Sequence, residues 1–345
     1  MKTKPMTKFA ILALSLVLVA CAGGGSEEAG CPAIDGREIN VVATTPMIGE
    51  FVSQVGGENI NLTVLMPPEA NPHTYEPAPQ DAGTIAEADL VFYTGLLYEP
   101  AALVKLLENS ACSTDILSEV GESVFPIEFK EGGHDDHDDH DDHDDEEGHD
   151  DEEGHDDEEG HDDHEGHNHG AYDPHFWFDP SRVAYAAEYI ESRLIEFDPE
   201  NESSYKSSAD SFVSELNDLT KQVSELISTV PSQNRKLITT HESLGYLEAK
   251  FGLEVLSTII PSLNSANEIS PSDLAGVIDV IEDNNVKVIF IESEAPSVYS
   301  ETIVAETGIK PVTGLYVETL KPGQSYSEFL ISNVTLITEN LQDTD

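Results

Sequence analysis

Short apolar runs alternate with amphipathic segments over the first half of the chain. The apolar runs predict strands at residues 38–43, 61–66, 89–93 and 123–129. The segments between them have helical spacing, and they predict helices at residues 46–55, 78–87 and 100–109. Strands that alternate with helices are typical of parallel βαβ units. We therefore expect an α/β lobe over residues 37–198.

The same alternation returns in the last third of the chain. Here the apolar runs predict strands at residues 236–240, 253–260, 286–292 and 311–317. Helices are predicted at residues 243–251, 270–285, 296–307 and 326–341, and the second of these begins with a good capping signal. A second α/β lobe is therefore expected over residues 231–345.

Two helices are predicted between these lobes. The first covers residues 181–197 and ends at Asp198-Pro199, and the second is a linking helix over residues 199–230. Apolar positions in the second recur every three or four residues, at Tyr205, Ala209, Phe212, Val213, Leu216, Leu219, Val223, Leu226 and Ile227. At about 1.5 Å per residue this helix would be about 45 Å long, enough to pass from one lobe to the other. A coiled-coil dimer seam is the alternative, although the pattern lasts barely four heptads.

The first 20 residues have the pattern of a signal peptide. Lysines precede an apolar run at residues 9–20, which is shorter than the roughly 20 residues that a membrane-spanning helix needs. Small residues then lead into Cys21, as at the cleavage site of a bacterial lipoprotein; the alternative is an ordinary signal peptide with an incidental cysteine. We expect an exported protein that is anchored to the outer side of the cell membrane only by acyl chains on Cys21, with residues 21–36 as its tether.

Two further cysteines, Cys31 and Cys112, remain after Cys21. In an oxidising compartment they are candidates for one disulfide, although sequence alone does not show that they lie close together. They are poor candidates for zinc ligands, because they are not paired in sequence and have no neighbouring histidine.

Acidic residues dominate the charge of the chain, and many of them lie in one tract. The formal net charge is −52, and residues 131–170 hold 22 of the 68 acidic residues. The remaining acids still outnumber the 16 bases, so nucleic acid and anionic lipid surfaces are poor partners and a cationic ligand is favoured. The tract contains no apolar residue that could offset the entropy lost on ordering, so we expect a disordered loop.

Ten of the 13 histidines lie in this tract, at His134, His137, His140, His143, His149, His155, His161, His164, His167 and His169. We interpret them as auxiliary, low-affinity metal ligands. A solvating spacer is the alternative, but acidic residues alone would suffice for solvation.

The other three histidines, His73, His175 and His241, are far apart in sequence. His73, His241 and the acidic Glu318 each follow the carboxyl end of a predicted strand, which is where open α/β sheets bind ligands. Because these ends belong to two lobes, the side chains can meet only in the cleft between the lobes. His175 would join them from the loop before the helix at 181–197. Three imidazoles and one carboxylate suit Zn²⁺ and are acceptable for Mn²⁺.

Three motifs carry a resemblance to a known family: NPHTYEP at 71–77, DPHFWFDP at 173–180 and HESLGY at 241–246. They resemble signatures of the zinc- and manganese-binding lipoproteins of bacterial ABC importers, the ninth family of solute-binding proteins, or ZnuA/TroA type. Segments 288–292 and 315–320 also look like the family. The resemblance covers nearly everything from residue 38 onward.

The resemblance implies two α/β lobes joined by one rigid helix, with the metal between them. It implies His73, His175 and His241 as ligands and a monomer that docks on an ABC permease. The family's fourth ligand is commonly an Asp in the segment where this chain has Glu318, so either Glu318 or water completes the shell. The third imidazole and the His-rich tract favour zinc over manganese. For the carboxylates that orient the imidazoles, the candidates are Glu76, Glu242 and Asp179.

Two other function classes are weighed against this interpretation. A zinc hydrolase is disfavoured because the sequence has no His-Glu-x-x-His motif, no nucleophile elbow and no Gly-rich phosphate loop. A surface adhesin or zinc buffer without a transporter would use the same site, and the sequence leaves this alternative open.

Overall fold

The computed structural model describes Cys31, Ile34 and residues 36–129, 172–260, 271–293 and 298–342. The predictions for the signal peptide, for Cys21 and for the acidic tract with its ten histidines lie outside these residues. Within the described residues, no helix combines the length and the apolar character needed to cross a membrane.

The first lobe is built on a parallel sheet with the strand order β2-β1-β3-β4. Its strands are β1 (Ile39–Ala43), β2 (Ile60–Val64), β3 (Leu90–Tyr93) and β4 (Leu117–Glu119). The register pairs Val41 of the central strand with Leu62 on one side and with Leu90 on the other. Both edges of β1 are thus paired, and four of its five residues are buried, as expected for a central parallel strand whose two faces are covered.

The strand predicted at 123–129 is wrong, and β4 lies earlier in the chain. Residues Gly121–Val124 form a short 3₁₀ helix, and Glu128 makes only an isolated bridge with Tyr172. The segment is apolar, but Pro126 lacks the N–H that a strand needs for pairing. The guanidinium of Arg182 also donates to the carbonyl oxygens of Val124 and Phe125, so these groups bond to a side chain instead of a strand.

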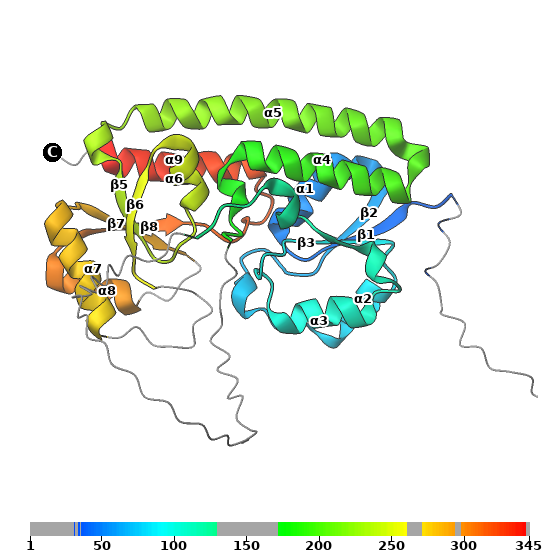
Figure 1. Ribbon diagram of the computed structural model, residues 1–345, viewed down its shortest axis with the longest axis horizontal. Coiled ribbons are helices and arrows are strands. Elements are labelled where there is room, and N and C mark those ends of the chain that lie inside the picture. Colours follow the sequence, from blue (N-terminus) through cyan, green and yellow to red (C-terminus); the bar gives the residue numbers. More distant parts are fainter. Residues whose placement is uncertain are drawn as a thin grey trace, which may run out of the picture. The chain divides into compact units, whose positions relative to one another are not determined.

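Helices cover both faces of this sheet (Figure 1). They are α1 (Pro46–Gly56) and α4 (Pro180–Phe197) on one face, and α2 (Pro79–Ala86) and α3 (Ala101–Ser110) on the other. Neighbouring residues of β1 show the division, because Val41 belongs to the core with α1 and α4, whereas Val42 belongs to the core with α2 and α3. This is the alternation of side chains that a strand requires.

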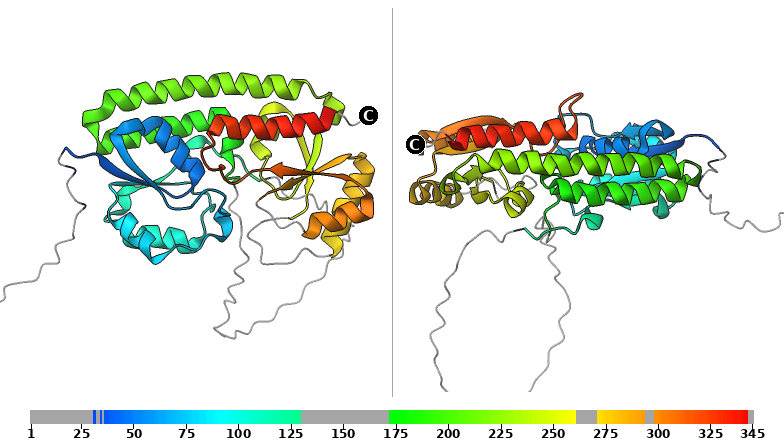
Figure 2. Two further views of the ribbon diagram at one scale, coloured as in Figure 1. Left: turned by 180° about the vertical axis from the view of Figure 1, so that it is seen from behind. Right: turned by 90° about the horizontal axis from the view of Figure 1, so that it is seen from above.

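The linking helix is α5 (Glu202–Ser228), which follows a 3₁₀ turn at Pro199–Asn201. It has 27 residues, so at about 1.5 Å per residue it is about 40 Å long. Its apolar stripe is buried against α1, α4 and the C-terminal helix α9 (Tyr326–Gln342) of the same chain. Figures 1 and 2 show α5 running alongside α4 and α9. The stripe is therefore used within one molecule, which removes the basis for the coiled-coil alternative.

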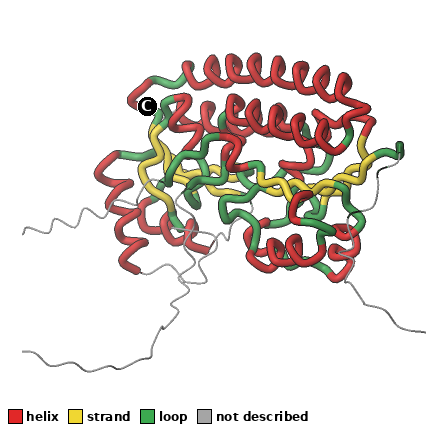
Figure 3. The backbone as a smooth tube through the Cα atoms, turned by 45° about the vertical axis from the view of Figure 1, so that its right-hand side comes forward, coloured by secondary structure: helices red, strands yellow, loops and turns green. Residues whose placement is uncertain are grey.

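The second lobe repeats the α/β arrangement. Its strands form two parallel pairs, β5 (Lys236–Thr239) with β6 (Glu254–Thr258) and β7 (Val288–Glu292) with β8 (Lys310–Leu315), and β5 lies against β7. The helices are α6 (Gly245–Phe251), α7 (Pro271–Asn284), α8 (Val298–Thr307) and α9. The strands lie between helices, as in the first lobe (Figure 3).

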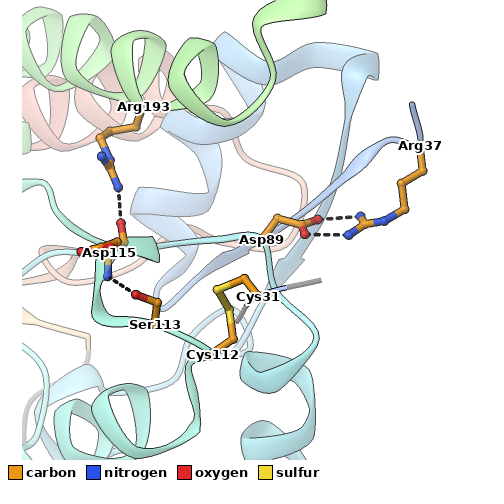
Figure 4. The surroundings of a disulfide bond; sticks show 7 residues. All are labelled: Cys31, Arg37, Asp89, Cys112, Ser113, Asp115 and Arg193. Atoms are coloured by element: carbon orange, nitrogen blue, oxygen red, sulfur yellow. Dashed lines mark hydrogen bonds and ion pairs between the residues drawn. A yellow bond between two sulfur atoms is a disulfide. The ribbon is translucent and has the colours of Figure 1, made fainter. Parts of the chain in front are cut away.

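A disulfide joins Cys31 to Cys112, whose Cα atoms are 5.1 Å apart (Figure 4). It attaches the start of the described chain to the residue pair that follows α3. Nearby, both terminal nitrogens of Arg37 donate to the carboxylate of Asp89 at 2.6 Å. The segment that leads into β1 is thus held to the first lobe by one covalent bond and one bidentate ion pair.

Candidate metal site

Four side chains from distant parts of the chain converge at one point between the two sets of strands. His73 lies in the 3₁₀ turn Pro72–Thr74, which follows β2, and His175 directly precedes the turn Phe176–Phe178 that leads into α4. His241 and Glu318 lie just beyond the carboxyl ends of β5 and β8. One ligand atom from each residue lies within 4.8 Å of the corresponding atom of every other. These are the four residues that the sequence nominated.

The centre of the group is a single carboxylate oxygen. Oε1 of Glu318 lies 2.7 Å from Nε2 of His241, 3.1 Å from Nε2 of His73 and 3.4 Å from Nε2 of His175. None of the four side chains is more than 5% exposed. All three imidazoles therefore present the same nitrogen to one desolvated point.

Local hydrogen bonds hold the backbone of each histidine, and they also orient the rings of His175 and His241. The side chain of Asn71 accepts a hydrogen bond from the backbone N–H of His73 at 2.9 Å, which caps the turn that carries this histidine. Asp173 Oδ1 accepts from the backbone N–H of His175 at 2.8 Å and lies 2.7 Å from its Nδ1. Glu292 does the same for His241, accepting from the backbone N–H and contacting Nδ1.

The two carboxylates at Nδ1 also decide the tautomer. An acceptor at Nδ1 retains the proton there, so in the neutral ring the lone pair of Nε2 is directed to the centre of the site. The sequence-based candidates for this role were Glu76, Glu242 and Asp179, and the structure places Asp173 and Glu292 at Nδ1 instead. Asp179 caps α4 by accepting from the backbone N–H of Ser181, and Glu76 is exposed.

Of the two orienting carboxylates, Asp173 had a signal in the sequence and Glu292 did not. Asp173 stands two residues before His175 in the same motif, a spacing that lets one carboxylate reach the backbone N–H and the ring of that histidine. Glu292 is the last residue of β7, and β7 lies beside β5, the strand that leads to His241. The contact between β7 and β5 is a feature of the tertiary structure, and hydrophobic periodicity in the sequence does not reveal it.

Two aromatic residues hold the segment that carries Glu318. The hydroxyl of Tyr98 donates to Oε2 of Glu318 at 2.8 Å, and the indole N–H of Trp177 donates to the backbone carbonyl of Val317 at 2.8 Å. The sequence analysis did not select Tyr98. It lies just beyond the carboxyl end of β3, so the rule that selected His73 and His241 would also have found it.

The charges in this group shift the protonation equilibria strongly. Burial lowers the pKa of His175, but the negative charges of Glu318 and Asp173 together raise it to about 9. Burial likewise lowers the pKa of His241, but the charge of Glu292, the hydrogen bond to Glu292 and the charge of Glu318 raise it well above the ordinary value. Burial raises the pKa of Glu318, but the charges of His73 and His175 bring it well below its usual range. The group is therefore built to hold positive charge.

One ring nitrogen at the centre fits a site for a cation better than a closed hydrogen-bond network. His241 Nε2 is buried and has no well-aligned hydrogen bond to any described residue. His241 Nε2 lies only 2.7 Å from Glu318, so the short distance is not accompanied by hydrogen-bond geometry. Nitrogen lone pairs and an oxygen that point at a shared centre are what a four-coordinate transition-metal ion requires.

The sequence matches proteins that are named for metal uptake. Residues 41–340 match the family model described as zinc-uptake complex component A, periplasmic. The manganese ABC transporter substrate-binding lipoprotein PsaA of Streptococcus anginosus is 26% identical, over 98% of this chain and 99% of that protein. The high-affinity zinc uptake system protein ZnuA of Bacillus subtilis (strain 168) is 27% identical, over 96% of each chain.

The fold has close counterparts among solved structures. The periplasmic zinc-binding protein TroA from Treponema pallidum superposes with a TM-score of 0.70, covering 88% of this chain and 99% of that one. Its sequence identity is 20%, so this likeness concerns the fold. It supports the predicted α/β architecture of two lobes.

Proposed function

Because the chain belongs to the family of periplasmic zinc-uptake component A proteins, we propose that it captures Zn²⁺ outside the cytoplasm and delivers the ion to an ABC-type importer. The family consists of substrate-binding components of importers, not of enzymes. The proposed ligands are His73, His175, His241 and Glu318. The observation that carries the proposal is the approach of three Nε2 atoms to one oxygen of Glu318, in a site from which solvent is nearly excluded.

Capture of the ion is an exchange of protons for metal. The three imidazoles must be neutral to act as ligands, so a divalent cation displaces the protons that the raised pKa values of His175 and His241 retain. Asp173 and Glu292 keep Nδ1 protonated and hold each ring in place during this exchange. The site changes little in net charge, because incoming cation and outgoing protons offset each other.

The donor set is the reason for proposing zinc rather than manganese. Three imidazole nitrogens and one carboxylate oxygen suit a borderline cation with a tetrahedral preference, whereas Mn²⁺ favours more oxygen ligands and a larger shell. The relatives include proteins named for each metal, PsaA for manganese and ZnuA for zinc. A manganese-binding protein of the same type is therefore the second candidate.

The remaining parts of the chain have proposed roles around this site. We infer that Cys21 carries the lipid anchor and that the ten histidines of the acidic tract bind zinc weakly and raise its local concentration. A monomer would deliver the ion by docking on a membrane permease that is driven by an ATPase. A surface zinc buffer or adhesin without transport is the alternative use of the same site.

The decisive experiment replaces His73, His175 and His241 by alanine and measures zinc retained after dialysis against a mild chelator. We expect the wild type to retain one ion per molecule and the triple variant to retain none. Deletion of residues 132–170 is the matched control, since it should remove weak sites and keep the tight one. A triple variant that keeps its tightly bound ion would refute the site.

Transport is tested separately from binding. Cells that lack this protein should take up less zinc at limiting concentration, and the wild-type gene should restore uptake while the triple variant should not. Normal uptake in its absence, together with tight binding in vitro, would favour the buffer or adhesin.

A further inference from the structure

The two oxygens of the Glu318 carboxylate have different partners. Oε1 faces the three Nε2 atoms at 2.7–3.4 Å, whereas Oε2 accepts a hydrogen bond from the hydroxyl of Tyr98 at 2.8 Å. The same hydroxyl lies 3.1 Å from the backbone oxygen of Glu318. Tyr98 is 1% exposed, and its ring packs edge-on against His73 with 5.1 Å between centroids. The hydroxyl therefore holds one oxygen of Glu318 away from the imidazoles, so that only the other oxygen faces them.

The loop that presents Tyr98 has an unusual backbone. The three residues before it, 95–97, have φ values of 77°, 52° and 60°, although two of them are leucines. L side chains rarely adopt this region, and such strain persists only where surrounding contacts hold it. Strain held in this way is typical of segments that place a functional group.

Two carboxylates hold this loop. Glu99 accepts from the backbone N–H groups of Thr94 at 2.7 Å and Gly95 at 2.9 Å, and Glu119 accepts from that of Leu96 at 2.8 Å. Glycine is required at position 95, because a Cβ there would lie 2.0 Å from Oε1 of Glu119. The position of the Tyr98 hydroxyl is thus determined by several contacts and not only by its bond to Glu318.

We propose that Tyr98 is a selectivity-determining residue that confines Glu318 to one ligand oxygen. The site then offers four ligand atoms, three nitrogens and one oxygen, which is the number that tetrahedral Zn²⁺ prefers. Mn²⁺ favours a larger shell of oxygen ligands. The inference rests on the proposed function, since it assumes that the metal lies at this cluster.

The role predicts opposite consequences for the two metals when the hydroxyl is removed. With Tyr98→Phe the ring still fills its place, but Oε2 loses the hydrogen bond and the carboxylate can turn to offer both oxygens. A fifth, oxygen ligand improves the shell for Mn²⁺ and spoils the tetrahedral shell for Zn²⁺. A residue that merely supported the fold would weaken both metals by the same factor.

The test measures the dissociation constants for Zn²⁺ and Mn²⁺ in the full chain, by competition with chelating indicators. We expect the preference for Zn²⁺ over Mn²⁺ to fall about tenfold in Tyr98→Phe. Loss of a residue that hydrogen-bonds a metal ligand typically lowers metal affinity about 10- to 100-fold, and the expected change is at the lower end of this range. The matched control is Tyr205→Phe, since the Tyr205 hydroxyl is also buried and donates to a carboxylate, Asp198, at 2.6 Å. That control lies in α5 away from the cluster, and its metal preference should equal that of the wild type.

Cobalt provides a second readout, the coordination number of the bound ion, and the wild-type spectrum is informative by itself. The Co²⁺-loaded wild type should give the intense visible absorption of a four-coordinate ion, and Tyr98→Phe should give the weaker bands of a larger shell. A five- or six-coordinate wild type would overturn the inference even if the variant failed to fold. So would an unchanged metal preference, or an equal loss for both metals. Failure of the wild type to bind either metal tightly would instead refute the proposed function.

Discussion

Oδ1 of Asp173 lies 2.7 Å from Nδ1 of His175 and accepts a hydrogen bond from the backbone N–H of the same residue at 2.8 Å. One buried oxygen thus fixes both the backbone and the ring of a proposed metal ligand. Cβ of an alanine at position 245 would lie 2.7 Å from the other oxygen, so the small residue Gly245 makes room for this carboxylate. Asp173 is thus held in place by its own close neighbours, as is the proposed ligand that it orients.

The first prediction concerns Asp173→Asn, which keeps the size of the side chain and removes its charge. Zinc affinity should fall about 10- to 100-fold, because His175 loses the partner that fixes its tautomer. Equilibrium competition with a fluorescent chelator measures this change. Asp179→Asn is the control from the same motif; Asp179 caps α4, and zinc affinity should stay within about twofold of wild type. Similar losses in both variants would contradict the assignment of Asp173.

The second prediction is that zinc affinity rises with pH. In the metal-free protein, burial lowers the pKa of His175 and the nearby carboxylates raise it to about 9, so at neutral pH zinc must displace a proton. The apparent affinity should increase as the pH is raised toward about 9, where His175 loses its proton. Calorimetry in buffers of different protonation enthalpy should also show that protons are released on binding. A flat profile, without proton release, would contradict the prediction.

The same shift has a consequence for the metal-free fold. A histidine whose pKa is higher in the folded state stabilises that state fully below its unfolded pKa of about 6.5. This contribution is lost as the pH rises through the folded pKa of about 9. The metal-free protein should therefore become less resistant to urea over this interval, whereas the zinc-loaded protein should not follow the same trend.

The sequence pointed to the proposed ligands, which the structure brings together, more directly than to the residues that support them. His73, His175 and His241 were identified because histidine is rare outside the acidic tract and because two of them follow strands. Glu292 was missed, because its contact with His241 depends on β7 lying beside β5, and no local pattern specifies which strands are neighbours. Tyr98 also follows a strand end, but a phenol is an uncommon metal ligand, and its role depends on the tertiary contact with Glu318.

In the fold too, elements with a local sequence pattern were predicted correctly, whereas those that depend on tertiary contacts were not. Seven of the nine apolar positions predicted for the stripe of α5 are buried, because a helix that buries one face must repeat every three or four positions; Val213 and Leu226 are partly buried at its margin. The strand at 123–129 was wrong, because the partner of the Val124 carbonyl is the side chain of Arg182 in a helix far along the chain. β4 has only three residues, which is too short for a periodic signal.

The third prediction compares two glycines. Gly95→Ala should lower the free energy of unfolding by more than about 1 kcal/mol, since the position has a positive φ. An added Cβ would also meet Glu119 at 2.0 Å. Gly83→Ala, in the helix α2 with nothing near the added Cβ, should instead stabilise by about 0.5–1 kcal/mol. Urea unfolding of the two metal-free variants measures both changes in the free energy of unfolding. Equal changes would contradict the inference that the loop at 95–97 is strained.

The fourth prediction concerns the disulfide between Cys31 and Cys112. The two residues are 81 positions apart, so the bond closes a long loop in the unfolded chain and restricts it strongly. Replacing both cysteines by serine should lower the free energy of unfolding by about 2–4 kcal/mol. Zinc affinity should stay within about twofold of wild type, because the bond joins the start of the described chain to the segment after α3 (Figure 4) and neither cysteine belongs to the group of four proposed ligands.

Reduction of the wild type provides the control for this variant. Under a thiol reductant the wild type should unfold at the same urea concentration as the double serine variant, and the variant itself should be insensitive to the reductant. Loss of stability together with loss of zinc would mean that the disulfide also positions the site. Equal stability of the oxidised wild type and the variant would mean that the bidentate pair of Arg37 with Asp89 already holds the N-terminal segment in place. The two contacts can then be separated by adding Arg37→Ala to the serine background.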